Sequence, residues 1–135
     1  METRREVKLD SGSTLKVAPA AFPASKRLYQ AILKEMKGVQ IYSLAELPTV
    51  LKDVFCLGFA SPEIEKCLYE CFKNCTIDSG GGEIRITEDS FERVEARQDY
   101  IQVCIEVAEE NVRPFLKSLY AQYLRLLSMT ESTPA

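Results

Sequence analysis

The sequence predicts one domain of the mainly α, α+β class, with an N-terminal β-hairpin packed on a bundle of four to five helices. Three observations predict this fold. Two short segments near the start alternate apolar and polar residues, most later apolar residues recur at helical spacing, and the last third contains a long apolar run. The 135 residues are enough to bury one core. We therefore expect residues 1–135 to form a single domain.

The strands are predicted near the start and again in the middle of the chain. Residues 6–9 and 14–17 alternate in polarity, and residues 10–13 between them have the composition of a turn. Because an isolated two-stranded hairpin is marginally stable, we expect it to pack on the helices. A second short hairpin is predicted around residues 76–86, on both sides of the glycine-rich loop 78–82.

Proline, serine and glycine mark the starts and ends of the first predicted helices. The first starts at Pro23 and stops near Gly38. The second starts at either Ser43 or Pro48 and runs to about Leu57. The inward stripe of the first helix is predicted to contain Leu28, Tyr29, Ile32, Leu33 and Met36.

The third helix starts at Ser61-Pro62 with a cap, a proline and an acidic residue. Its apolar stripe is predicted to contain Ile64, Cys67, Leu68, Cys71, Phe72 and Cys75. Residues 87–89 then lead into another helical segment, with Phe91 and Val94 as its expected anchors in the core.

The last predicted helix, from about Ala96 to Leu127, is unusually apolar. Up to Ala108 its apolar residues spread around most of the circumference, which is typical of a helix that is buried centrally or shared with a partner. Because proline removes one backbone hydrogen bond and clashes with the preceding turn, Pro114 predicts a kink or break near residues 110–113. Residues 128–135 are predicted to form a flexible tail.

The composition argues against several classes of function. The chain has no histidine, five cysteines and a formal net charge of −3. Without histidine, Cys-His and Ser-His-Asp catalysis is impossible within this chain. The start does not resemble a secretory signal, and no stretch approaches the roughly 20 apolar residues of a membrane span. We therefore predict a cytoplasmic protein with reduced thiols, no enzymatic activity and no cofactor.

Cysteines recur every four residues at Cys67, Cys71 and Cys75. Three thiolates on one helix face could hold zinc if Cys56 or Cys104 supplied a fourth ligand. The same face carries large apolar residues, and a free cysteine behaves as a small buried apolar residue. Core packing is therefore the favoured interpretation.

Three other clusters also have simpler interpretations. The glycine run 80–82 lacks the lysine that a P-loop requires, and it predicts a turn. Glu106 and Glu110 share a helix face and are expected to be solvated. The basic residues could contribute to a nucleic-acid surface, but acidic residues interrupt them and the whole chain is acidic, so a dedicated surface of this kind is disfavoured. They are Arg4, Arg5, Lys8, Lys26, Arg27, Lys34 and Lys37.

The aromatic and aliphatic run from Phe115 to Leu127 has two interpretations, which the sequence does not separate. It could pack in the core, or it could capture a partner on an exposed surface. The candidate partner-binding residues are Phe115, Leu116, Leu119, Tyr120 and Tyr123.

Several segments resemble tail assembly chaperones of long-tailed (siphovirus-type) bacteriophages. These segments are Leu9–Val17, Phe22–Ala24, Leu28–Ala31, Cys71–Thr76, Ile86–Phe91, Ala96–Tyr100 and Asn111–Phe115. The resemblance spans about residues 5–120. It implies a mainly helical, self-associating protein that binds the tape-measure protein, keeps it soluble and helps to recruit tail-tube protein. It also implies that the protein is absent from the finished tail and that a longer, frameshifted form can exist.

Two other functional classes remain open at this point. One is a structural head-tail or tail component of a virion. The other is a small metal- or nucleic-acid-binding regulator, for which the cysteine face and the basic residues would be the starting points.

Overall fold

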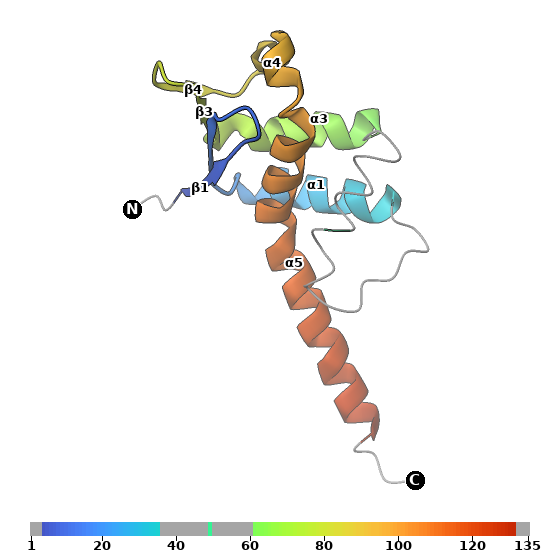
Figure 1. Ribbon diagram of the computed structural model, residues 1–135. Helices are drawn as coiled ribbons and strands as arrows, with labels where there is room; N and C mark the ends of the chain where they lie inside the picture. The colour runs from blue at the N-terminus through green and yellow to red at the C-terminus, as the bar shows by residue number, and fades with distance from the viewer. Residues whose placement is uncertain (1–3, 36–48, 50–60, 132–135) are drawn as a thin grey trace.

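The computed structural model describes residues 4–35, 49 and 61–131. Apart from Thr49, the predicted helix that ends at Leu57 lies outside the described residues, as do Met36 and Gly38. Figure 1 shows a head, in which the strands lie beside crossing helices, and one long helix that leaves it. Among the described residues, no helix is both long and apolar enough to cross a membrane.

The elements follow one another in the order expected of an α+β domain with an N-terminal hairpin, as predicted. They are β1 (Arg5–Lys8), β2 (Thr14–Val17), α1 (Phe22–Glu35), α3 (Pro62–Cys71), the 3₁₀ turn η2 (Phe72–Asn74), β3 (Thr76–Asp78), β4 (Glu83–Arg85), the 3₁₀ turn η3 (Glu88–Phe91), α4 (Val94–Arg97) and α5 (Tyr100–Glu131).

The strands form one antiparallel sheet in the order β1-β2-β3-β4. Both predicted hairpins are present, and pairing of β2 with β3 joins them, which the sequence did not predict. Antiparallel partners point to the same face, so Val7, Leu15, Ile77 and Ile84 form one apolar row across the sheet. Leu15 is fully buried, whereas Ile84 at the edge is 66% exposed.

Two turns join the hairpin strands. In the first, the Leu9 amide donates to the Ser13 carbonyl over 2.8 Å, and Gly12 has a φ of +97° that favours glycine. In the second, the Asp78 carboxylate accepts from the Gly80 amide at 2.8 Å. The glycine run is therefore a turn, as predicted.

Helix α1 buries one face against α3 and α5. Leu28 and Ile32 are in the core as predicted, but Leu33 is 40% exposed and the prediction for it was wrong. Ala24 and Ala31 also face inward, and they centre the buried stripe on residues 24, 28, 31 and 32. Leu33 lies well outside that stripe because successive residues are about 100° apart.

Helix α3 begins as predicted and ends earlier than predicted. The Ser61 hydroxyl caps it by accepting from the Ile64 amide at 3.2 Å. The helix stops at Cys71, and η2 continues the chain to Cys75, so the predicted apolar stripe is not a single helix. The tighter turn nevertheless keeps the stripe in the core, because Ile64, Leu68, Cys71, Phe72 and Cys75 are all at most 1% exposed.

The segment between the sheet and α5 consists of two short helices. Thr87 and Ser90 form a reciprocal capping box at η3, in which Ser90 Oγ accepts from the Thr87 amide at 2.9 Å. Arg93 is extended and separates η3 from α4. Phe91 is buried as predicted, but Val94 is 75% exposed and is not an anchor. The interruption at Arg93 changes the helix register, which turns Val94 to solvent.

Helix α5 is one helix of 32 residues that begins at Tyr100, not at Ala96. It passes through Pro114 without a break, so of the two predicted alternatives the break near residues 110–113 is wrong, and the kink stays a prediction. Pro114 is exposed, and solvent can satisfy the carbonyl that loses its helical partner. The helix continues to Glu131, into the segment predicted as a tail, and residues 132–135 lie outside the described residues.

Candidate functional site

Helix α5 has two parts with different surroundings. We call Tyr100–Leu116 the root and 117–131 the projecting half. The root lies in the core, with Val103, Val107 and Val112 fully buried. The projecting half extends away from the head, as Figure 1 shows. At 1.5 Å per residue it is about 22 Å long.

A buried amide holds the root against the start of α1. Asn111 is 2% exposed. Its Oδ1 accepts from the Ala20 amide and the Ser25 hydroxyl, each over 2.8 Å, and its Nδ2 donates to the Val107 carbonyl over 2.8 Å. These bonds satisfy a buried polar group, and they make the position of α5 against α1 specific.

An aromatic cluster marks the point where α5 leaves the head. Phe115 stacks on Tyr29 with ring centroids 4.9 Å apart, and Phe22 lies 5.9 Å from Phe115 in a tilted arrangement. Burial in this cluster raises the pKa of Tyr29. Phe22 is 65% exposed, so an apolar surface begins at the base of the projecting half.

The five predicted partner-binding residues do not share one environment. Leu116 is in the core and Phe115 is half-buried in the aromatic stack, whereas Leu119 is 52% exposed. Tyr120 and Tyr123 belong to α5, but their side chains lie outside what the structure describes. Leu124, which was not among the candidates, is 47% exposed. Among the side chains described beyond Leu116, Leu119 and Leu124 are therefore the exposed large apolar residues.

Glu106 and Glu110 of α5 were predicted to be solvated, but both are ion-paired. Arg5 of β1 binds Glu106 over 2.8 Å and Glu110 over 3.0 Å, and both carboxylates are partly covered. The pairing of β1 with β2 places Arg5 beside the helix, which sequence spacing could not reveal. These carboxylates therefore have a structural partner that attaches the sheet to α5.

Basic residues of α1 also have structural partners. Arg27 binds Glu70 over 2.7 Å, and Lys34 binds Glu63 over 3.5 Å. Both carboxylates belong to α3, which packs beside α1. Lys37 lies outside the described residues. The charges of Arg27 and Lys34 are therefore neutralised in part by the neighbouring helix.

The cysteine face packs in the core, as favoured from the sequence. Cys71 and Cys75 are fully buried, and their thiols lie 3.7 Å from the carbonyl oxygens of Ala24 and Ala18. Burial raises the pKa of Cys71 to about 12, so its thiol resists forming the thiolate that binds zinc. Cys67 is half-buried. Within the part of the chain that the structure describes, no group of three potential ligands could hold a metal ion.

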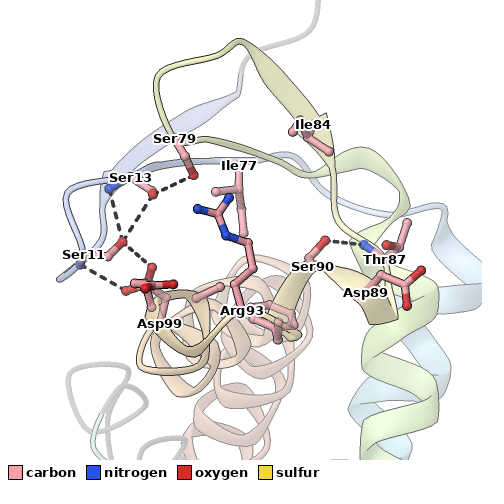
Figure 2. A pocket seen from close by; sticks show the side chains of 13 residues that line it. Ser11, Ser13, Ile77, Ser79, Ile84, Thr87, Asp89, Ser90, Arg93 and Asp99 are labelled. Atoms are coloured by element: carbon pink, nitrogen blue, oxygen red, sulfur yellow. Dashed lines mark hydrogen bonds between the residues drawn. The ribbon is translucent and has the colours of Figure 1, made fainter.

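A cleft of about 460 Å³ lies between the sheet and the η3–α4 segment. Its lining is apolar at Ile77, Ile84, Phe91 and Ala96. Figure 2 shows polar side chains from both turns and from η3 around it, with the Arg93 side chain extending into the space. The sequence did not predict this cleft because its residues come from separate segments, which the pairing of β2 with β3 brings together.

A serine network closes one end of the cleft. Asp99, which is 3% exposed, accepts from the Ser11 amide at 3.2 Å and also from the Ser11 hydroxyl. The hydroxyls of Ser13 and Ser79 form a hydrogen bond of 2.9 Å. The two hairpins and the start of α5 are thereby connected through side chains.

Comparisons with protein-family models, with curated proteins and with solved structures match nothing to this chain.

Proposed function

We propose that this protein is a phage tail assembly chaperone that binds the helix-rich tape-measure protein through the projecting half of α5. The proposal combines the sequence resemblance with one structural observation. An apolar helix leaves the head and exposes Leu119 and Leu124 beyond Leu116, the last core residue among the described side chains. Recruitment of tail-tube protein is a further part of the proposal that the resemblance implies.

The chemistry of the surface supports a helical partner. A free tape-measure protein is long and helix-rich, and it exposes apolar stripes before assembly. Amphipathic helices bind one another through apolar residues three or four positions apart, and in the sequence Leu119 and Tyr123 have this spacing, as do Tyr120 and Leu124. Covering such stripes would keep the partner soluble.

The anchoring of α5 supports the same role. The Asn111 hydrogen bonds and the Phe115–Tyr29 stack fix the root, so the projecting half starts from a rigid base. A helix with a fixed start loses less conformational entropy on binding than a free segment. Phe22, exposed beside Phe115, extends the apolar surface onto the head.

The proposal is tested by co-expression with the tape-measure protein encoded in the same genome. We expect the double variant Leu119→Glu, Leu124→Glu to lose co-purification, because two charges would be buried against an apolar partner. Since both leucines are exposed, the melting temperature of the isolated protein should change little.

The control is Val94→Glu, which places one such charge on an exposed apolar residue in the head. It should co-purify as well as the unaltered protein. Retention of the partner by the folded double variant, or equal loss with Val94→Glu, would refute the projecting half as the binding surface.

A further inference from the structure

The cleft between the sheet and the η3–α4 segment is independent of the proposed function. It lies in the head, at the end of the molecule opposite the tip of α5 (Figure 1). Its volume of about 460 Å³ falls within the range of sites for small ligands or single side chains. It combines an apolar surface with a cationic group, and this combination limits what it can bind.

The apolar surface continues the row of side chains that fills the core. Leu15 and Ile77 are cross-strand partners, as are Ile77 and Ile84. Exposure rises along this row, from fully buried Leu15 to half-buried Ile77 and then to Ile84 at 66%. Ile84 therefore leaves apolar area uncovered at the cleft, and an aliphatic group of a ligand could cover it.

The cationic group is Arg93. Figure 2 shows its side chain extending into the cleft, toward Ile77. Within the described residues its guanidinium has no ion pair, whereas Arg97 donates to the carbonyls of Phe91 and Glu92. A guanidinium can bind a carboxylate through two parallel hydrogen bonds, and it binds this group with better geometry than a lysine would.

Ser90 supplies a hydrogen-bond donor in the same cleft. Its Oγ accepts from the Thr87 amide, so the hydroxyl proton remains free to point elsewhere. Within the part of the chain that the structure describes, the Ser90 hydroxyl proton has no acceptor. Ser90 and Arg93 both line the cleft, so each presents a donor to an anionic group bound there.

The carboxylates of the cleft restrict the charge of the ligand. Asp99 is committed to Ser11 and is buried. Asp89 and Glu95 also line the cleft, and Asp89 lies at the opposite end from Ser11 in Figure 2. Their negative charges oppose a polyanion such as phosphate more strongly than a monoanion.

We propose that this cleft binds a ligand with an aliphatic body and a single carboxylate group. The carboxylate binds Arg93 and Ser90, and the aliphatic body packs on Ile77 and Ile84. Such a group can come from a free carboxylic acid or from the C-terminal leucine of a peptide, and the two sources can be distinguished experimentally.

The test is an NMR titration of the ¹⁵N-labelled full chain with 4-methylpentanoate. We expect saturable shifts of amides around the cleft, with a dissociation constant on the order of 1 mM because the ligand is small. The neutral 4-methylpentanamide should bind about tenfold more weakly, since it loses the charged hydrogen bonds. Inorganic phosphate should cause no saturable shift.

Two variants distinguish binding in the cleft from a general effect of the protein's charge. Arg93→Gln should weaken 4-methylpentanoate binding about tenfold. Arg85→Gln is the matched control, because Arg85 is exposed, adjoins Ile84 and does not line the cleft. It should leave the dissociation constant unchanged. Both arginines are exposed, so neither change should unfold the protein.

A peptide pair identifies the source of the ligand. Acetyl-Ala-Ala-Leu with a free carboxylate is compared with its amide. Tighter binding of the peptide acid than of 4-methylpentanoate would indicate a chain terminus, and weaker binding would indicate a free acid. The proposal is overturned if no ligand gives saturable shifts, if acid and amide bind equally, or if Arg85→Gln weakens binding as much as Arg93→Gln.

Discussion

The two halves of α5 have similar apolar sequences and opposite surroundings. In the root, Val103, Val107 and Val112 are fully buried by α1, α3 and the sheet. In the projecting half, Leu119 and Leu124 are 52% and 47% exposed, although they continue the apolar character of the same helix. The difference shows that an apolar stripe determines which residues can be buried, and that neighbouring elements determine which of them are.

The largest expected effect on stability comes from placing a charge on either side of the junction between the root and the projecting half of α5. Leu116→Glu should lower the free energy of unfolding by about 3 kcal/mol or more, because an unpaired carboxylate would be buried in the core. Leu119→Glu, three residues later, should change it by no more than about 0.5 kcal/mol. Urea denaturation of both variants measures the difference. Equal destabilisation would mean that the projecting half is also packed.

Pro114 lies inside the root, close to its end, and gives the second prediction. Pro114→Ala should raise the free energy of unfolding by about 1 to 3 kcal/mol, because it restores a helical hydrogen bond and removes a steric clash. Denaturant unfolding measures stability, and helix content is followed by circular dichroism. A loss of stability would indicate that the proline ring makes a contact that the core requires.

The buried thiols of the head predict a dependence on pH. Burial raises the pKa of Cys71 and of Cys104 from 9.0 to about 12. Between these values the unfolded chain loses protons that the folded chain retains, so stability should fall as pH rises above about 9. The expected slope is about 1.4 kcal/mol per pH unit for each thiol.

Denaturation under reducing conditions between about pH 8.5 and 10.5 measures this slope, within the range where the two states differ in bound protons. Cys104→Ala should be less stable below about pH 9, because it leaves a small cavity, and should show a shallower slope above that pH. An unchanged slope would mean that Cys104 is accessible to solvent in the folded state.

Local patterns predicted much of the fold. Alternation and turn residues predicted both hairpins, and Ser61 predicted the start of α3. The errors occur where a pattern fits more than one outcome. Leu33 is apolar and has near-helical spacing, yet the buried face of α1 is set by the contacts of Ala24 and Ala31. Val94 is exposed because extended Arg93 interrupts the helix before it.

The environment of the candidate site residues depended more on tertiary structure than the secondary structure did. The sequence left Phe115 as a candidate for either the core or a partner surface, and the structure shows that α1 supplies Tyr29, which stacks on it, and Phe22, which lies tilted beside it. The cleft around Arg93 could not be predicted from the sequence, since its lining comes from both hairpins, η3 and α4. No spacing in the sequence relates such distant residues.

The sequence by itself determined the secondary structure of the described residues to a large extent, because turns, caps and periodicity are local properties. It also determined the apolar character of α5 along most of its length. Only the tertiary structure decided where that helix leaves the core and which charges are paired. Both depend on the approach of distant elements. Helices α1 and α3 pack on the root of α5, whereas Leu119 and Leu124 stay exposed, and β1 brings Arg5 to Glu106 and Glu110.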